Sequence, residues 1–293
     1  MKKLVTLLAL VTINAYGMEQ EHKHNFIFSH GFSVAGGTSK RFVAHDIVPK
    51  DCSSFHYQDA RYRIEVSDGW ELGLNTWDSC LAQDGDIEKL ASEINEKDHD
   101  KIVLFGESRG ASAIINYLGS KHVHHNKIKA AVLDSPFDKI PNVITHRMRR
   151  LYLDRIIPPK LVEWGLAFFY MRNYKIDGIQ PIHSIEKISQ EIPLLFLCSQ
   201  EDTRVPWKSS AQLYKKLREK GHDKAHILML DCGAHGFLVS GKYGKIYRDV
   251  THAFYKKYGI EYNPDYATAG EDIFAIQCQP TIKEIEDTIL LYQ

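Results

Sequence analysis

Short apolar runs recur along the chain and alternate with longer segments of helical periodicity. The runs are four to seven residues long and lie at 25–29, 53–57, 101–105, 130–133, 192–198 and 226–230. Largely apolar runs of this length are typical of strands that are buried on both faces of a parallel sheet. We therefore expect strands at these positions, with the run at 53–57 the weakest.

Helical periodicity is clearest between these runs. Ile87, Leu90, Ala91 and Ile94 have the i, i+3, i+4, i+7 spacing of one helix face. Similar stripes predict helices at 109–118, 208–220 and 243–254, and a capping-box pattern at 281–284 predicts one more. Strands that alternate with helices indicate an α/β fold with a mostly parallel sheet. Ligands bind such sheets where the strands end, so the residues after each run are the candidates for chemistry.

Length and charge narrow the class of protein. The chain has 293 residues, with 37 Lys and Arg against 37 Asp and Glu, so its formal net charge is zero. A chain of this length buries enough surface to fold without metal or disulfide support. Nucleic-acid binding favours a basic excess, so we expect no nucleic-acid partner. No run of eighteen apolar residues is present, which argues against a protein with several membrane spans.

The N-terminus has the pattern of an export signal. A basic start is followed by an uncharged, largely apolar run at 4–13 and by the small residues Ala15 and Gly17. This order is typical of a secretory signal peptide. We expect residues 1–17 to be removed and the mature protein, 18–293, to be periplasmic or secreted. The alternatives are an N-terminal strand, or translation that begins at the second methionine.

Five cysteines are present, at positions 52, 80, 198, 232 and 278. Export would permit disulfides, and Cys52 with Cys80 is a plausible pair. Cys198 and Cys232 lie in apolar runs, where we expect them to be buried. No CxxC motif is present, and the short histidine-rich segments lack matching cysteine or acidic ligands. We therefore expect neither a metal nor a cofactor.

A serine lies between a predicted strand and a predicted helix, in the pattern Gly106-Glu107-Ser108-Arg109-Gly110. A sharp turn from strand to helix forces such a serine into a strained backbone conformation and exposes its oxygen at a helix N-terminus. Glycines on either side let the neighbouring backbone approach closely. This pattern in this setting predicts that Ser108 is a nucleophile.

Backbone amides near this serine are candidates for an oxyanion hole. His30-Gly31-Phe32 follows the first apolar run, where a glycine lets the chain turn back over the serine. The amides of Phe32 and Arg109 are then expected to point at one site. A plain turn that ends the strand is the simpler interpretation of His30-Gly31 by itself.

An acid and a histidine follow two other strands. Asp202 comes shortly after the run at 192–198, and His235 comes after the last run. A histidine in this position can take the serine proton, and a carboxylate can orient that histidine and stabilise its cation. Asp134 follows another strand and is a rival for the acid.

Together these residues resemble the α/β-hydrolase superfamily, in which serine, acid and histidine follow separate strands in this chain order. The motifs that carry the resemblance are His30-Gly31, Gly106–Gly110, Asp202 with Val205-Pro206, and Gly233–Gly236. The resemblance covers roughly residues 25–258 and implies a sheet of about six strands flanked by helices. The serine motif and the Gly-Ala-His-Gly motif also resemble the catalytic domains of prolyl-oligopeptidase-type peptidases, and we expect no counterpart of their propeller domain within these residues.

One long connection interrupts the pattern, at 139–190. The resemblance implies a helical cap inserted here, after the strand at 130–133, into a single domain. The aromatic-rich segment 161–171 could line a pocket over Ser108, although the simpler interpretation is that it forms the cap's own core. A basic cluster at 146–155 could meet an anionic substrate or bring the cap into peripheral contact with an anionic membrane. Its simpler interpretation is a solvated face.

These features lead to three hypotheses of function. In the first, Ser108 attacks a small-molecule carboxylic ester or thioester, while His235 takes the proton and Asp202 orients the histidine. The second is a serine peptidase or amidase of the prolyl-oligopeptidase type, which uses the same triad on a short peptide. The third is a non-catalytic binding protein on a hydrolase fold, because a fold does not imply a function.

Overall fold

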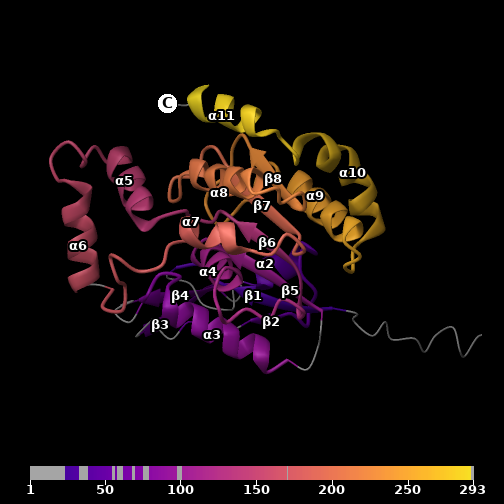
Figure 1. Ribbon diagram of the computed structural model, residues 1–293, viewed down its shortest axis with the longest axis horizontal. Helices are drawn as coiled ribbons and strands as arrows, with labels where there is room; N and C mark the ends of the chain where they lie inside the picture. The colour runs from indigo at the N-terminus through magenta and orange to yellow at the C-terminus, as the bar shows by residue number, and fades with distance from the viewer. Residues whose placement is uncertain are drawn as a thin grey trace, which may run out of the picture.

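A six-stranded parallel sheet lies at the centre of the molecule (Figure 1). In spatial order its strands are β2 (Ser53–Ser54), β1 (Asn25–Ser29), β5 (Ile102–Glu107), β6 (Ile128–Asp134), β7 (Leu194–Ser199) and β8 (Ala225–Leu230). Every neighbouring pair runs parallel. The prediction of a parallel sheet of about six strands is confirmed, and the apolar runs mark its strands.

The computed structural model describes most of the chain, namely residues 24–32, 39–54, 57, 62–67, 70–74, 79–97, 101–169 and 171–291. The signal peptide that we predict at 1–17 lies outside the described residues. None of the described helices is both long and apolar enough to span a membrane.

Helices cover both faces of the sheet, and others lie away from it. They are α2 (Ser39–Ala44), α3 (Asp84–Asn95), α4 (Arg109–Leu118), α5 (Ile140–Arg150), α6 (Pro159–Phe169), α7 (Pro181–Ser184), the 3-10 turn η2 (Ile185–Lys187), α8 (Trp207–Glu219), α9 (Gly244–Lys257), α10 (Pro264–Gln277) and α11 (Ile282–Leu291). The helices predicted from periodicity are confirmed as α3, α4, α8 and α9, and the capping box begins α11. Helix α10 and an antiparallel hairpin of β3 (Tyr62–Ser67) and β4 (Trp70–Leu74) were not predicted.

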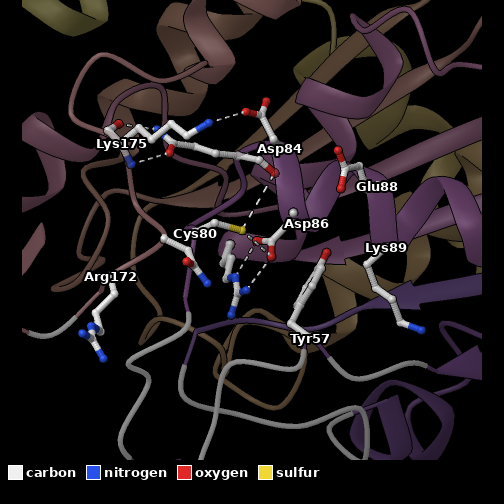
Figure 2. Close-up of a pocket in the computed structure, with 12 residues that line it drawn as sticks. Tyr57, Cys80, Asp84, Asp86, Glu88, Lys89, Arg172 and Lys175 are labelled. Carbon is white, nitrogen blue, oxygen red and sulfur yellow. Dashed lines mark hydrogen bonds and ion pairs between the residues drawn. The ribbon is translucent and has the colours of Figure 1, made fainter.

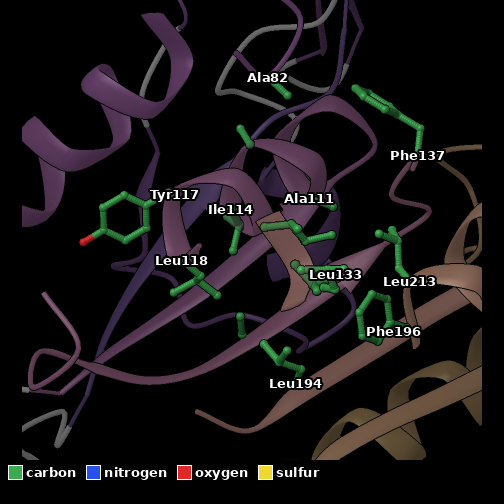
Figure 3. Packing of buried hydrophobic residues seen from close by; sticks show 14 of the residues in the cluster. Ala82, Ala111, Ile114, Tyr117, Leu118, Leu133, Phe137, Leu194, Phe196 and Leu213 are labelled. Atoms are coloured by element: carbon green, nitrogen blue, oxygen red, sulfur yellow. The ribbon is translucent and has the colours of Figure 1, made fainter. Parts of the chain in front are cut away.

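Each central strand divides its side chains between two apolar cores. In β5, Leu104 packs on one face with α3, α4 and α8, whereas Val103 and Phe105 pack on the other face with α2, α9 and α10. Figure 3 shows the first of these cores, where Leu133 and Phe196 of neighbouring strands lie beneath α4. Because both faces are covered, the strands are apolar throughout rather than alternating.

The connection between β6 and β7 contains α5, α6 and α7. Figure 1 shows α5 and α6 as a pair of helices at one side of the molecule, away from the sheet. The buried side of α5 carries Ile144 and Met148. The interpretation of the 161–171 aromatics as the cap's own core is wrong for Trp164, Phe168 and Phe169, which are 60%, 77% and 72% exposed.

The predicted Cys52–Cys80 pairing is wrong, because both residues are free cysteines. Cys52 packs against the core that contains α9, whereas the Cys80 sulfur lies 3.0 Å from Oδ1 of Asp86 at the start of α3. Burial raises the pKa of the Cys80 thiol to about 12. Cys198 is buried as predicted, but Cys232 is only half-buried.

Two glycines inside helices have very different surroundings, which allows a matched test of the packing. A Cβ at Gly270 on α10 would lie 2.1 Å from the carbonyl oxygen of Asp249 on α9, while nothing lies within 4 Å of a Cβ at Gly165 on α6. We expect Gly270→Ala to lower the free energy of unfolding by about 1–3 kcal/mol, because the two helices must separate. Gly165→Ala raises it by up to about 1 kcal/mol, since alanine is the better helix former. Denaturant unfolding measures both changes, and equal stabilities would contradict this packing.

Candidate active site

Ser108 occupies a strained turn between β5 and α4. Its backbone angles are φ 54° and ψ −113°. This conformation is energetically unfavourable for any residue other than glycine. The Ser108 amide donates a hydrogen bond of 2.7 Å to the carbonyl oxygen of Asp134 on β6. At the helix side, the Ser108 carbonyl accepts the Ser112 amide at 3.0 Å. The turn predicted from the serine motif is therefore present. The predicted exposure of the serine is wrong, because Ser108 is only 8% exposed.

The glycines of the motif are required by close approaches of the backbone. A Cβ at Gly106 would lie 2.6 Å from the Cα atom of Ala111. A Cβ at Gly110 would lie 1.9 Å from the carbonyl oxygen of Ser29, at the end of β1. Real Cβ atoms do not tolerate such distances. The first turn of α4 therefore rests directly on the end of β1, beside His30 and Gly31.

His235 and Asp202 come together from two separate loops. The loop after β8 carries His235, and its Nδ1 lies 2.6 Å from Oδ2 of Asp202 in the loop after β7. The other carboxylate oxygen of Asp202 accepts the backbone amides of Arg204 and Val205, at 2.8 and 2.9 Å. Both side chains are buried. The carboxylate is thus held from one side by the backbone and orients the imidazole from the other.

The histidine loop packs against the strand end that carries Ser108. Gly236 has φ 77°, and a Cβ there would lie 2.6 Å from Oε1 of Glu107, the residue before the serine. Burial alone would lower the pKa of His235, but the hydrogen bond and the charge of Asp202 outweigh it. The carboxylate of Glu107 contributes in the same direction, and the pKa of His235 lies above its ordinary value of 6.5.

Asp134, the rival acid, has other partners. It is buried at the end of β6, where the Tyr247 hydroxyl donates to Oδ2 at 2.9 Å and the Ser135 hydroxyl donates to Oδ1 at 2.8 Å. Burial, followed by the negative charge of Glu107, raises the pKa of Asp134 to about 7. The imidazole of His235 is therefore hydrogen-bonded to Asp202, and Asp134 acts on it only through charge.

The two residues predicted for the oxyanion hole begin α4 and follow β1. Arg109 is the first residue of α4, directly after the serine. Phe32 is half-buried and packs against the core that contains α4. The residues just before Phe32 are held by Tyr57. The His30 ring accepts the Tyr57 amide at 3.1 Å, and the Ser29 and Tyr57 hydroxyls are hydrogen-bonded to each other. The segment after β1 is thus fixed beside the serine turn.

Sequence reasoning missed two buried ion pairs that border this site. Asp86 binds the Arg109 guanidinium through both oxygens, at 2.7 and 2.6 Å, and the guanidinium lies 4.2 Å from the centre of the Tyr57 ring. Arg41 of α2 donates to Glu107 at 2.9 Å. Neither pair follows a local spacing rule, because 23 and 66 residues separate the partners.

A cavity of about 580 Å³ opens next to Arg109. Figure 2 shows Asp86, Tyr57 and Cys80 on one part of its wall and Arg172 and Lys175 on another. Charges of both signs line it. Within the described part of the chain, no group of three or more histidine, cysteine or acidic residues is arranged to hold a metal ion.

The chain is similar to curated bacterial proteins over part of its length. It is 29% identical over 141 residues to the uncharacterized protein YqkD of Bacillus subtilis, which covers 45% of this chain and 43% of that protein. It is 25% identical over 174 residues to the uncharacterized protein YfhR of Escherichia coli K12, which covers 57% and 52%. The chain spans about half the length of these relatives.

Solved structures of hydrolases have a similar fold. The esterase Pf2001 of Pyrococcus furiosus matches with a TM-score of 0.54 at 16% identity, over 81% of this chain and 83% of the esterase. The monoacylglycerol lipase of Paleococcus ferrophilus matches with a TM-score of 0.51 at 16% identity, over 80% and 93%. The fold is that of the α/β-hydrolases, as the sequence resemblance implied.

A family model identifies the chain more specifically. The model of the prolyl oligopeptidase family matches residues 86–260, from α3 to just beyond α9, and this segment contains Ser108, Asp202 and His235. The match covers more than half of the 293 residues, and the chain therefore belongs to the prolyl oligopeptidase family.

Proposed function

We propose that the protein is a serine hydrolase that cleaves a carboxylic ester or thioester through Ser108, His235 and Asp202. The observation that carries this proposal is the 2.6 Å hydrogen bond between His235 and Asp202, in loops beside the strained turn of Ser108. The names of two structural neighbours, an esterase and a lipase, favour an ester. The family's name favours a peptide bond, so a serine peptidase with the same triad is the second candidate.

In the proposed first step, His235 makes Ser108 a nucleophile. A serine hydroxyl is weak until a base takes its proton. Nδ1 of His235 is engaged by Asp202, so Nε2 is the nitrogen that accepts this proton. Asp202 keeps the ring in that tautomer and stabilises the imidazolium that forms. The raised pKa of His235 makes it a stronger base than a free histidine.

Bond cleavage follows through a tetrahedral intermediate. The Ser108 oxygen bonds to the carbonyl carbon, and the amides of Phe32 and Arg109 stabilise the oxyanion, each by about 3 kcal/mol. The intermediate collapses as the bond to the leaving alcohol or thiol breaks, and His235 gives the leaving group its proton. Water then attacks the acyl-serine with His235 again as base, which releases the acid and restores Ser108.

A fluorophosphonate probe tests the nucleophile directly. We expect labelling at Ser108 by peptide mapping, and we expect Ser108→Ala to abolish labelling and lower kcat by at least about 10⁴-fold. Ser112→Ala is the matched control, because Ser112 is a buried serine one turn further along α4. The same preparations are assayed on nitrophenyl esters and matched nitroanilides, and the ester is expected to be the better substrate.

Each other outcome of this experiment has a distinct meaning. A higher kcat/KM for the anilide than for the ester would favour the peptidase. Folded wild-type protein that takes up no probe and cleaves neither substrate would favour a binding protein on a hydrolase fold.

Two asparagine variants distinguish the candidate acids. Asp202→Asn leaves the size of the side chain but removes the charge that orients His235, and we expect kcat to fall on the order of a thousandfold or more. Asp134→Asn is the matched control, since Asp134 is bonded to Tyr247 and Ser135 instead. We expect it to have the smaller effect on kcat. A larger loss in Asp134→Asn would exchange the two roles.

The pH dependence of kcat/KM tests His235 as the base. Activity should fall on the acid side as His235 becomes protonated, with a midpoint above 6.5 because its pKa is raised. Glu107→Gln removes a negative charge that favours the protonated ring, so the midpoint should move to lower pH. Glu93→Gln on the outer part of α3 is the control and should leave it unchanged. A midpoint that stays in place in Glu107→Gln would argue against this base.

A further inference from the structure

Helix α6 presents an apolar face to solvent. Leu161, Trp164 and Phe168 have the i, i+3, i+7 spacing of one helix face, and they are 62%, 60% and 77% exposed. Phe169 is also exposed, and its ring packs edge-on against that of Phe168. The side chain of α6 that is buried is acidic, Glu163. Val162 and Leu166 lie on the inner side of α6, so this helix is apolar on both sides, and its largest apolar side chains are left exposed.

The loop between α5 and α6 also exposes apolar side chains. Its exposed large side chains are Leu151, Tyr152, Leu153, Ile156 and Ile157. Large exposed apolar side chains that gather in one segment are typical of a surface that binds a partner or a membrane. We call the exposed apolar residues of the loop and of α6 the apolar face.

The orientation of α6 is held by contacts on its inner side. Glu163 accepts a hydrogen bond of 2.7 Å from the hydroxyl of buried Tyr174. Val162 and Leu166 pack against the core that contains α4. Rotating the helix to bury its aromatics would therefore break these contacts. The exposure of the α6 aromatics therefore follows from how the inner side of α6 is anchored.

Basic residues are interspersed along the same segment of the chain. Residues 147–169 contain five basic residues against two acidic ones, whereas the whole chain is balanced. The basic residues are Arg147, Arg149, Arg150, Arg155 and Lys160, and all are exposed. Of the two acids, Glu163 is buried, and Asp154 lies 3.7 Å from Nε of Arg149. The surface that meets solvent is thus apolar and positively charged.

We propose that the apolar face docks on an anionic membrane surface. Tryptophan, tyrosine and phenylalanine enter the boundary between headgroups and acyl chains, while arginine and lysine bind the anionic headgroups beside them. Each basic residue near such a surface adds to the attraction, which falls with salt. A second copy of this chain carries the same positive charge on the same face, so charge complementarity favours lipid over self-association.

Helix α5, which precedes the loop of the apolar face, contacts one of the proposed catalytic loops. His146 of α5 is hydrogen-bonded through Nε2 to the backbone oxygen of Asp202, at 3.0 Å. Membrane binding itself does not depend on the proposed chemistry, so failure of one leaves the other standing.

Vesicle flotation of the full chain tests the proposal. We expect binding to vesicles of phosphatidylcholine with about one third phosphatidylglycerol, weaker binding to phosphatidylcholine alone, and release in high salt. Phe168→Ser/Phe169→Ser and Arg149→Glu/Arg150→Glu should each lower the partition coefficient by at least about tenfold. Brominated acyl chains should quench tryptophan fluorescence in the wild type and quench it less in Trp164→Phe.

Matched controls separate this surface from general effects of charge and hydrophobicity. Ile276→Ser/Leu290→Ser removes two exposed apolar residues from α10 and α11, and Lys121→Glu/Lys242→Glu reverses two exposed charges elsewhere. Both controls should bind like the wild type. The N-terminal apolar segment is the same in every variant, so the differences report on the hairpin. Thermal melting confirms that the variants are folded.

Three outcomes would overturn the proposal. In the first, the wild type fails to bind the anionic vesicles, or it binds them no better than phosphatidylcholine vesicles. In the second, Phe168→Ser/Phe169→Ser and Arg149→Glu/Arg150→Glu bind the vesicles as well as the wild type and the two controls do. In the third, the wild type binds no lipid and sediments as a dimer, and Phe168→Ser/Phe169→Ser dissociates this dimer. That result would assign the apolar face to a second copy of the chain.

Discussion

The strained turn at Ser108 is the constraint on which the rest of the structure depends. A residue with a side chain keeps φ near 54° only where its surroundings leave no alternative. Here the first turn of α4 lies against the backbone of Ser29, so any larger residue at Gly110 would push helix and sheet apart. All ten residues of α4 are buried. The packing of this helix on β1, β5 and β6 offsets the strain and holds the serine at the carboxyl end of the sheet.

Buried charges surround this turn, and each is held by a partner. A buried ion that loses its partner is strongly destabilising, whereas a paired one roughly balances its desolvation. Arg109 is bound by both oxygens of Asp86, and Glu107 by Arg41. These pairs fix the residues on either side of Ser108 without occupying the serine itself. The negative charge that remains near His235 favours its protonated form, which is the form that a general base must reach in the transition state.

The sheet and the order of the site residues could be predicted from the sequence, because strands buried on both faces leave unbroken apolar runs. Helix α10 could not, since it packs through small residues such as Gly270 and only Phe274 gives it a large buried side chain. Two acids, Asp134 and Asp202, follow strands equally well in the sequence. The two differ in contacts that the sequence does not reveal: Asp134 accepts a hydrogen bond from Tyr247, more than a hundred residues away, whereas Asp202 is hydrogen-bonded to His235.

The hairpin of α5 and α6 departs from the pattern that holds elsewhere. In α3, α4 and α8 the periodic apolar residues are buried. In α6, Val162 and Leu166 pack only partly buried against the core, while Trp164, Phe168 and Phe169 are exposed. Burying a leucine or phenylalanine stabilises a protein by about 1.5–3 kcal/mol, so this arrangement forgoes stability. Local inconsistencies of this kind are expected at functional surfaces. The arginines of the same segment make this surface positively charged. His146 of α5 contacts the loop of Asp202. The insertion that contains α5 and α6 therefore exposes large apolar side chains at a cost in stability, and this exposure is what the proposed membrane docking would use.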